Sequence, residues 1–138
     1  MSKPLPASEL QRFLNSEFPG FKSRIVHTAL NHCELIRLVD HSDLRPGGTV
    51  SGPTMMELAD TALYVAVLAT IGLVPLAVTT NLTINFLRKP AANRDLRAVC
   101  ELHKVGKTQA TGSVSIYSQG DDRMVAHVVG TYAIPPRQ

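Results

Sequence analysis

Two carboxylates, Glu57 and Asp60, stand near the start of the only long run of strong helix formers in the chain, residues 53–71. At this i, i+3 spacing they point to neighbouring parts of one helix surface. A carboxylate held in this way can remove a proton from water or attack a carbonyl carbon. The rest of the run is apolar nearly all round, which predicts a helix buried on most of its surface. Acid–base or nucleophilic chemistry carried by these carboxylates would therefore take place beside a hydrophobic core.

The two carboxylates differ in how easily a structural role explains them. Thr54-Met-Met-Glu57 matches a capping box, in which Thr54 and Glu57 satisfy each other's backbone donors at the helix start. Asp60 lies further inside the helix, where capping does not reach, and burying an unpaired carboxylate is costly. Asp60 must therefore face a pocket, a partner or water. A salt bridge, an exposed position and a functional carboxylate all remain open for it.

The loop that leads into this helix, residues 45–53, contains three glycines and two prolines. Such a loop can bring its backbone very close to a ligand. Gly52 precedes a helix whose free N–H groups favour negative charge, so it is a candidate donor to an oxyanion. The alternative is that the glycines and prolines only make the turn into the helix.

Other catalytic patterns are poor in this sequence. There is no metal-ligand spacing of histidines, no phosphate-binding loop and no dinucleotide glycine fingerprint. Cys33 and Cys100 fall on predicted strands and are expected to be small buried hydrophobes. We expect neither a metal nor a cofactor. The five histidines, each expected on a strand or at the surface, are His27, His32, His41, His103 and His127.

Length and charge narrow the class of protein. The chain has 138 residues, the size of one domain, and 14 Lys+Arg against 11 Asp+Glu give a net charge of +3. Aromatic residues make up 5%, Trp is absent and no long basic run occurs, so nucleic acid is not an expected partner. A small polyanionic ligand or a merely solvated surface fits the mild positive charge.

The sequence gives no sign of export or of a membrane span. The first 18 residues carry acidic and basic side chains and lack the apolar stretch of a secretory signal, so we expect a cytoplasmic protein. Residues 61–87 are uncharged, but Gly72 and Pro75 interrupt them. Beyond Pro75, polar residues beginning with Thr79 alternate with apolar ones, which is typical of a strand.

The remaining pattern predicts an α+β fold. A short amphipathic helix is expected over 7–18, and two strands over 24–39 with a turn at Asn31-His32. Four more strands follow the long helix. Because that helix alone can cover their apolar face, we expect an antiparallel sheet curled around it. The four later strands are predicted over 77–87, 95–105, 108–118 and 123–134.

Two motifs carry a resemblance to a known family. Leu-Ala-Asp-Thr-Ala at 58–62 and Asn-Phe-Leu-Arg-Lys-Pro-Ala at 85–91 are similar to the motifs of hotdog-fold acyl-CoA thioesterases of the PaaI-like, phenylacetate-degradation type. The resemblance covers about residues 20–134. It implies a single hotdog domain over 1–138, with an N-terminal helix at about 7–19 and the core at about 20–134.

The resemblance also implies roles for individual residues. Asp60 would act on the thioester carbonyl of an acyl-CoA, either as a nucleophile or as a general base that activates water. Gly52 would donate its N–H to the oxyanion, and Thr79 would help hold the attacking water. Arg88 and Lys107 would meet the phosphates of coenzyme A. The reaction would need no metal.

The loop departs from the family pattern at two positions. Ser51 stands where the family has His, and Pro53 replaces the second glycine. Ser51 can hydrogen-bond the thioester oxygen but cannot act as an acid or base at neutral pH. A non-catalytic hotdog protein that binds acyl-CoA or another small ligand is therefore the alternative to a thioesterase. A hotdog hydratase is a weaker one, because no His lies near Asp60 in the sequence.

The same resemblance concerns assembly. Hotdog proteins of this type build their sites between subunits, so we expect a homo-oligomer, either a dimer or a dimer of dimers.

Overall fold

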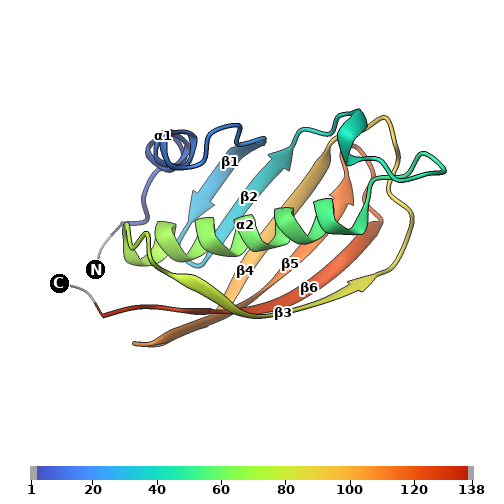
Figure 1. Cartoon of the computed structure of the whole chain (residues 1–138). Coiled ribbons are helices and arrows are strands. Elements are labelled where there is room, and N and C mark those ends of the chain that lie inside the picture. Colours follow the sequence, from blue (N-terminus) through green and yellow to red (C-terminus); the bar gives the residue numbers. More distant parts are fainter. Residues whose placement is uncertain (1–2, 137–138) are drawn as a thin grey trace.

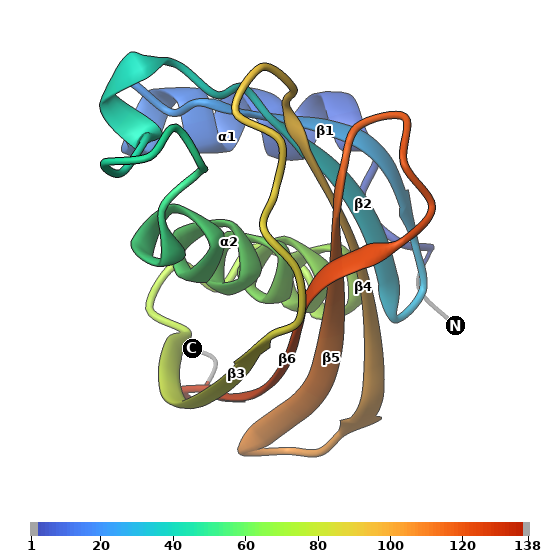
Figure 2. The ribbon, with the colours of Figure 1, turned by 90° about the vertical axis from the view of Figure 1, so that its right-hand side faces the viewer.

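One long helix, α2 (Gly52–Ile71), lies across the concave face of a six-stranded antiparallel sheet, and a short helix, α1 (Ala7–Glu17), packs against β1 and α2 (Figures 1 and 2). The computed structural model describes residues 3–136. This is the predicted α+β architecture. The other elements are β1 (Ser23–Ala29), β2 (His32–Arg37), the 3-10 turn η1 (His41–Asp43), β3 (Val78–Phe86), β4 (Leu96–Val105), β5 (Gln109–Ser118) and β6 (Met124–Ala133).

The order of the strands places β3 at a free edge of the sheet. That order is β1-β2-β4-β5-β6-β3, so β1 and β3 are the two edges. After β2 the chain runs through α2 across one face of the sheet and returns as β3 at the opposite edge (Figure 1). Apart from Leu82 and Ile84, which are half-buried, β3 is exposed along its length.

The helix α2 forms the centre of the hydrophobic core. Every residue from 62 to 69 is buried, as expected for a helix that is apolar nearly all round. By length and composition α2 could cross a membrane, but 67% of its most apolar window is buried inside the fold. The sheet supplies the covering side chains from alternate positions of β4 and β5, as predicted. Cys33 and Cys100 are buried cross-strand neighbours in this core.

A glycine on β6 allows α2 to approach the sheet closely. A Cβ atom at Gly130 would lie 2.5 Å from Leu63 Cδ1 and 2.9 Å from Leu82 Cδ1. Gly130 and Tyr132 are two residues apart on one strand, so they face the same side. The contact that seats Leu63 on Gly130 therefore also brings the preceding turn of α2 close to Tyr132.

Two predictions about local structure are wrong. The helix begins at Gly52 and its N-cap is Ser51, whose Oγ accepts from the Thr54 N–H at 3.3 Å. Thr54 is thus the third helical residue, and Glu57 lies too far along the helix to form the predicted capping box. The turn between β1 and β2 is centred on residues 30–31, with Asn31 at a φ of 61°, and His32 already belongs to β2.

The close approach at Gly130 generates the first prediction. Gly130→Ala places a methyl group into the packed contact with Leu63, so we expect a loss of about 1–3 kcal/mol in the free energy of unfolding. Urea denaturation measures it. Gly106→Ala is the matched control, since its Cβ would meet only the Gln109 carbonyl oxygen at 3.4 Å. Equal stability of the two variants would contradict the close packing of α2 on β6.

Candidate functional site

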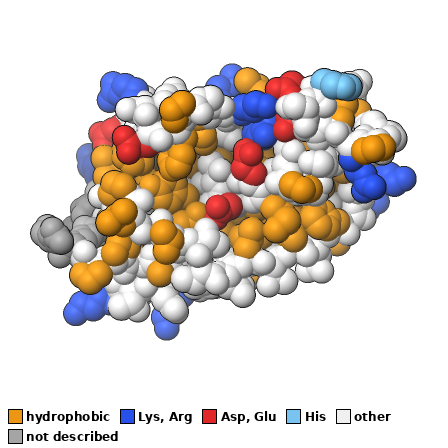
Figure 3. Space-filling view, viewed as in Figure 1, with side chains coloured by type: hydrophobic (Ala, Val, Ile, Leu, Met, Phe, Trp, Pro, Cys, Tyr) orange, Lys and Arg blue, Asp and Glu red, His pale blue; other side chains and the backbone are white. Residues whose placement is uncertain are grey.

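A cavity of about 760 Å³ opens along α2, on the side that faces α1 and the start of β3. On this face of the molecule, acidic side chains lie near the middle with hydrophobic side chains on either side (Figure 3). Its apolar wall is formed by Leu14, Phe18, Phe21, Tyr64, Pro75, Ala77 and Val78. Its polar wall is formed by Lys22, Arg37, Asp43, Glu57, Asp60, Thr61, Thr79 and Tyr132.

Asp60 lies on the cavity wall and is held by two hydroxyl groups. Its Oδ1 accepts a hydrogen bond from the Tyr132 hydroxyl at 2.7 Å and another from the Thr79 hydroxyl. Asp60 is half-buried, so its carboxylate is neither enclosed in the core nor fully exposed to solvent. Of the possibilities left open by the sequence, the structure selects a carboxylate that faces a pocket.

A β-bulge turns Thr79 toward Asp60. Strict alternation along β3 would put Thr79 on the opposite face from Leu82 and Ile84, which point to the core. The register with β6 shifts between Thr79 and Asn81, so that Thr79 pairs with Tyr132 while Leu82 pairs with Gly130. Both pairs therefore face α2. Bulges of this kind re-aim side chains, and they are common beside active sites.

The aromatic side chains of the cavity form a connected row. The rings of Phe18 and Tyr64 meet edge to face with centroids 6.2 Å apart, and Tyr64 and Tyr132 follow at 6.0 Å. The Tyr64 hydroxyl donates to the Pro75 carbonyl at 3.0 Å. The row gives the cavity an apolar end next to a polar end that carries Asp60.

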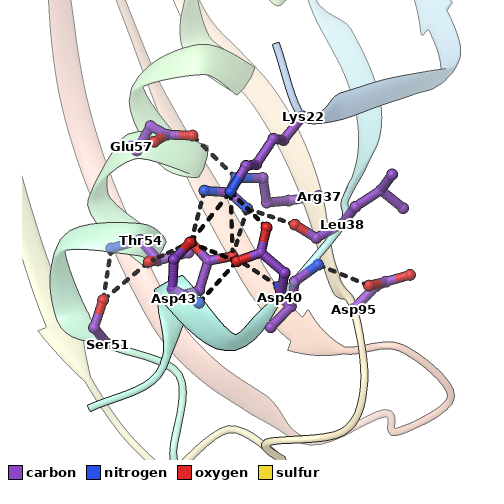
Figure 4. Close-up of polar contacts among 11 residues, drawn as sticks. Lys22, Arg37, Leu38, Asp40, Asp43, Ser51, Thr54, Glu57 and Asp95 are labelled. Atoms are coloured by element: carbon purple, nitrogen blue, oxygen red, sulfur yellow. Dashed lines mark hydrogen bonds and ion pairs between the residues drawn. The ribbon is translucent and has the colours of Figure 1, made fainter. Parts of the chain in front are cut away.

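A buried ion pair lies at the polar end, next to the start of α2 (Figure 4). The Arg37 guanidinium donates to both carboxylate oxygens of Asp43, at 3.0 and 2.9 Å, and only 4% and 6% of these side chains are exposed. The Arg37 Nε donates to Glu57 Oε1 at 3.0 Å. Glu57 is thus an ion-pair partner of Arg37, with 58% of its side chain exposed.

The ion pair also fixes the loop before α2. Asp43 Oδ1 accepts from the Thr54 hydroxyl at 3.2 Å, and the Asp43 carbonyl accepts from the Ser51 N–H at 2.8 Å. The hydroxyls of Ser51 and Thr54 lie 2.9 Å apart. The N-terminus of α2, with Gly52 as its first residue, is therefore held from β2 through Asp43 (Figure 4).

The other predicted site residues occupy different places. Gly52 and Arg88 share a groove of about 410 Å³ beyond the N-terminus of α2, together with Arg45 and Lys89. A Cβ at Gly52 would lie 3.1 Å from the Phe86 ring, so only glycine fits there without a shift. Lys107 lines a third pocket with Ile71, at the other end of α2. Within one chain, Asp60 and Thr79 thus lie together in the large cavity, and Gly52 and Arg88 lie together in the groove. Lys107 lies near neither pair.

Sequence reasoning missed Tyr132 and the Arg37–Asp43 pair. A signal for Arg37 was present, because Cys33, Leu35 and Arg37 alternate along β2 and the first two are core residues. A charged residue at a core-facing position indicates a buried partner. Among residues 3–136, no group of three or more His, Cys, Asp or Glu side chains is arranged to hold a metal ion.

Comparisons with known proteins converge on one family. The profile of the thioesterase superfamily matches residues 47–125. A crystal structure from Silicibacter sp. TM1040, of a protein provisionally named a thioesterase, is 40% identical, with a TM-score of 0.90 over 99% of this chain and 96% of that one.

More distant structures share the fold. Thioesterase superfamily member 2 of zebra fish has a TM-score of 0.84 at 18% identity, over 95% of this chain and 99% of that one. The E. coli PaaI protein from the phenylacetic acid degradation operon has a TM-score of 0.81 at 21% identity, over 94% and 91%. No curated protein matches the chain.

The buried ion pair generates a prediction about stability and its pH dependence. Asp43→Asn leaves the buried Arg37 without its closest counter-charge, so we expect a loss of about 3–5 kcal/mol at neutral pH. Burial alone would raise the pKa of Asp43, but hydrogen bonds from Arg37 and from the Asp40 N–H outweigh it and lower the pKa. A lowered carboxyl pKa stabilises the fold above the unfolded value of about 3.9, and this contribution disappears as the pH falls through the folded value.

Urea unfolding at a series of pH values measures both effects. Wild-type stability should decline in the range below about pH 4, and the profile of Asp43→Asn should be flatter there. Asp121→Asn is the control, because the Arg123 side chain lowers the pKa of Asp121 to about 2 in an exposed hairpin. Equal losses in the two variants at neutral pH would show that burial of the Arg37–Asp43 pair is unimportant.

Proposed function

Because the chain belongs to the thioesterase superfamily and has its hotdog fold, we propose that it hydrolyses an acyl-CoA thioester with Asp60 as the essential carboxylate. The observation that carries this proposal is the position of Asp60, half-buried on the central helix and facing a cavity large enough for an acyl group. Attack on the carbonyl carbon, by Asp60 or by a water that it deprotonates, gives a tetrahedral oxyanion. Collapse of that oxyanion breaks the C–S bond and releases the coenzyme A thiolate. When water has attacked, the free acid forms directly. When Asp60 has attacked, an anhydride between the acyl group and Asp60 remains, and a water molecule then hydrolyses it to the free acid and the Asp60 carboxylate.

The N-terminus of α2 supplies groups that suit the other parts of this reaction. Gly52 is the first helical residue, so its N–H has no partner within the helix. Eight residues of helix, about 12 Å, separate it from Asp60 of the same chain, so the oxyanion at Asp60 would take the N–H of Gly52 of the partner subunit. The Ser51 hydroxyl stands next to it. The cations of the adjoining groove, Arg45, Arg88 and Lys89, suit the phosphates of coenzyme A. We propose that the reaction uses no metal and takes place in the cytoplasm.

The free edge of β3 supports a homo-oligomer. An exposed edge strand offers unpaired backbone groups to another strand, and exposed apolar side chains beside it favour an interface. Val78, Phe86 and Leu87 are each more than half exposed along this edge. Pairing there would bring a second chain against the start of β3 and against the groove at Gly52, so that sites would lie between subunits.

One observation favours a second candidate function. Ser51 stands where the family has His, and a serine offers no acid or base at neutral pH. A hotdog protein that binds acyl-CoA without cleaving it would show saturable binding and no release of thiol.

The central prediction concerns Asp60. Release of free coenzyme A thiol from short, medium, long and aromatic acyl-CoAs should exceed the spontaneous rate for at least one of them. Asp60→Asn keeps an acceptor oxygen for Tyr132 and Thr79, so it should fold normally, yet lose turnover by at least about 100-fold. Glu101→Gln, on the exposed face of β4, is the matched control and should keep wild-type turnover. Equal activity of Asp60→Asn and wild type would sink the mechanism, and a silent panel with saturable binding would favour the second candidate.

The predicted assembly has its own test. Sedimentation velocity at micromolar concentration should give a mass of two or four chains of 15.0 kDa. A monomer under these conditions would remove the model of sites between subunits while leaving the role of Asp60 intact.

A further inference from the structure

Both described hydrogen bonds to the Asp60 carboxylate end on the same oxygen. Oδ1 accepts from the Tyr132 hydroxyl at 2.7 Å and from the Thr79 hydroxyl, and within residues 3–136 no group donates to Oδ2. We propose that Tyr132 is a positioning residue that, with Thr79, holds Oδ1 and leaves Oδ2 as the reacting oxygen. This oxygen attacks the thioester carbon or takes the proton from water. The inference rests on the proposed function of Asp60.

The two donors come from paired strands, β3 at the edge of the sheet and β6 next to it. Thr79 and Tyr132 are direct partners across the β3–β6 ladder, and Tyr132 is only 3% exposed. The Tyr132 ring packs beside the Tyr64 ring, and Leu63 sits against Gly130 two residues before Tyr132. Neither the phenol nor the turn of α2 that carries Asp60 can shift without disturbing the core. The clamp thus fixes the direction of the carboxylate.

The Tyr132 hydroxyl acts as a donor toward this carboxylate. Burial raises the pKa of Tyr132 and the nearby charge of Asp60 raises it further, and together they outweigh the opposite effect of Thr79. The net effect keeps the proton on the phenol. The same hydroxyl lies 3.0 Å from the Asp60 carbonyl oxygen, but the carboxylate oxygen is nearer and charged, so it is the stronger acceptor.

The charged groups around the cavity are engaged elsewhere. Arg37 donates to Asp43 and Glu57, and Lys22 pairs with Asp40 at 2.8 Å. Neither cation forms an ion pair with Asp60 within the described residues. Asp60 is therefore held by neutral hydroxyls, which orient it without neutralising its charge. The other titratable groups on the cavity wall are Lys22, Arg37, Asp43, Glu57 and Tyr64.

This arrangement gives Tyr132 a signature that a merely structural tyrosine lacks. Tyr132→Phe keeps the buried ring and deletes only the donor. We expect kcat to fall by about 10- to 100-fold with KM changed little, because orientation of the attacking group is lost.

Two further tyrosine variants serve as controls. Tyr64→Phe deletes a hydroxyl in the same cavity that binds the Pro75 carbonyl, and its effect should fall on KM rather than on kcat. Tyr117→Phe, where the ring packs under Arg97 away from the cavity, should behave as wild type. If Tyr132→Phe fails to fold, Thr79→Val on the exposed edge strand deletes the other donor and must lower kcat in the same way.

A measurement independent of turnover separates this inference from the proposed function. The carbon-13 chemical shift of the Asp60 carboxyl at neutral pH reports the hydrogen bonds to it, so it should change in Tyr132→Phe and stay in Tyr64→Phe. An active wild type with unchanged kcat and carboxyl chemical shift in Tyr132→Phe would overturn the inference alone. A changed chemical shift in a protein without thioesterase activity would support the clamp and refute the proposed function.

Discussion

The structure depends on the need to cover a helix that is apolar nearly all round. From residue 62 to 69 every side chain of α2 is buried, and no single flat layer could cover all of them. The sheet therefore curls, and the segment through α2 returns the chain to the far edge as β3 (Figure 2). Of α2, mainly the first turns then remain accessible to solvent and ligands. Polar chemistry on the helix is confined to that region, where Glu57 and Asp60 lie.

Burial of α2 imposes a second requirement on the polar groups around its start. Each of them has to find a partner, because an unpaired charge in such surroundings is costly. The molecule meets this in two ways. Arg37 and Asp43 form a closed pair that is almost fully buried and that ties β2 to the N-terminus of the helix. Within residues 3–136 the Asp60 side chain has only hydroxyl partners, so its carboxylate is oriented yet remains available. The first arrangement suits a structural support and the second a reactive group.

Much of the fold and part of the site could be predicted from the sequence, and the limits have physical causes. The run of helix formers in α2 and the alternation in β4 and β5 are local features of the sequence, so the helix and these strands could be predicted directly. Asp60 stood out because a carboxylate inside an apolar helix is unusual. Thr79 reaches Asp60 because a bulge follows it in β3. A prediction based on strict alternation places its side chain on the opposite face. Tyr132 is far away in sequence, and its role follows from the β3–β6 register. The predicted capping box was misplaced because Ser51, one residue before the helix, is the N-cap in place of Thr54.

In the proposed function, Ser51, which stands where the motif that the sequence resembles has a histidine, narrows the chemistry that this site could perform. A histidine can protonate a leaving group at neutral pH, and a serine cannot. An alkoxide or amine leaving group needs that proton, whereas a thiol with a pKa of about 8.5 departs readily as the thiolate. Thioester cleavage thus asks only for an attacking group and a stabilised oxyanion. In the proposed mechanism Asp60 and the N-terminus of α2 offer these two, so serine at position 51 would disfavour ester and amide hydrolysis far more than thioester hydrolysis. Asp60 would then supply either the attack itself or the proton transfer that activates water, which makes the direction of its free oxygen the geometric requirement on which turnover would depend.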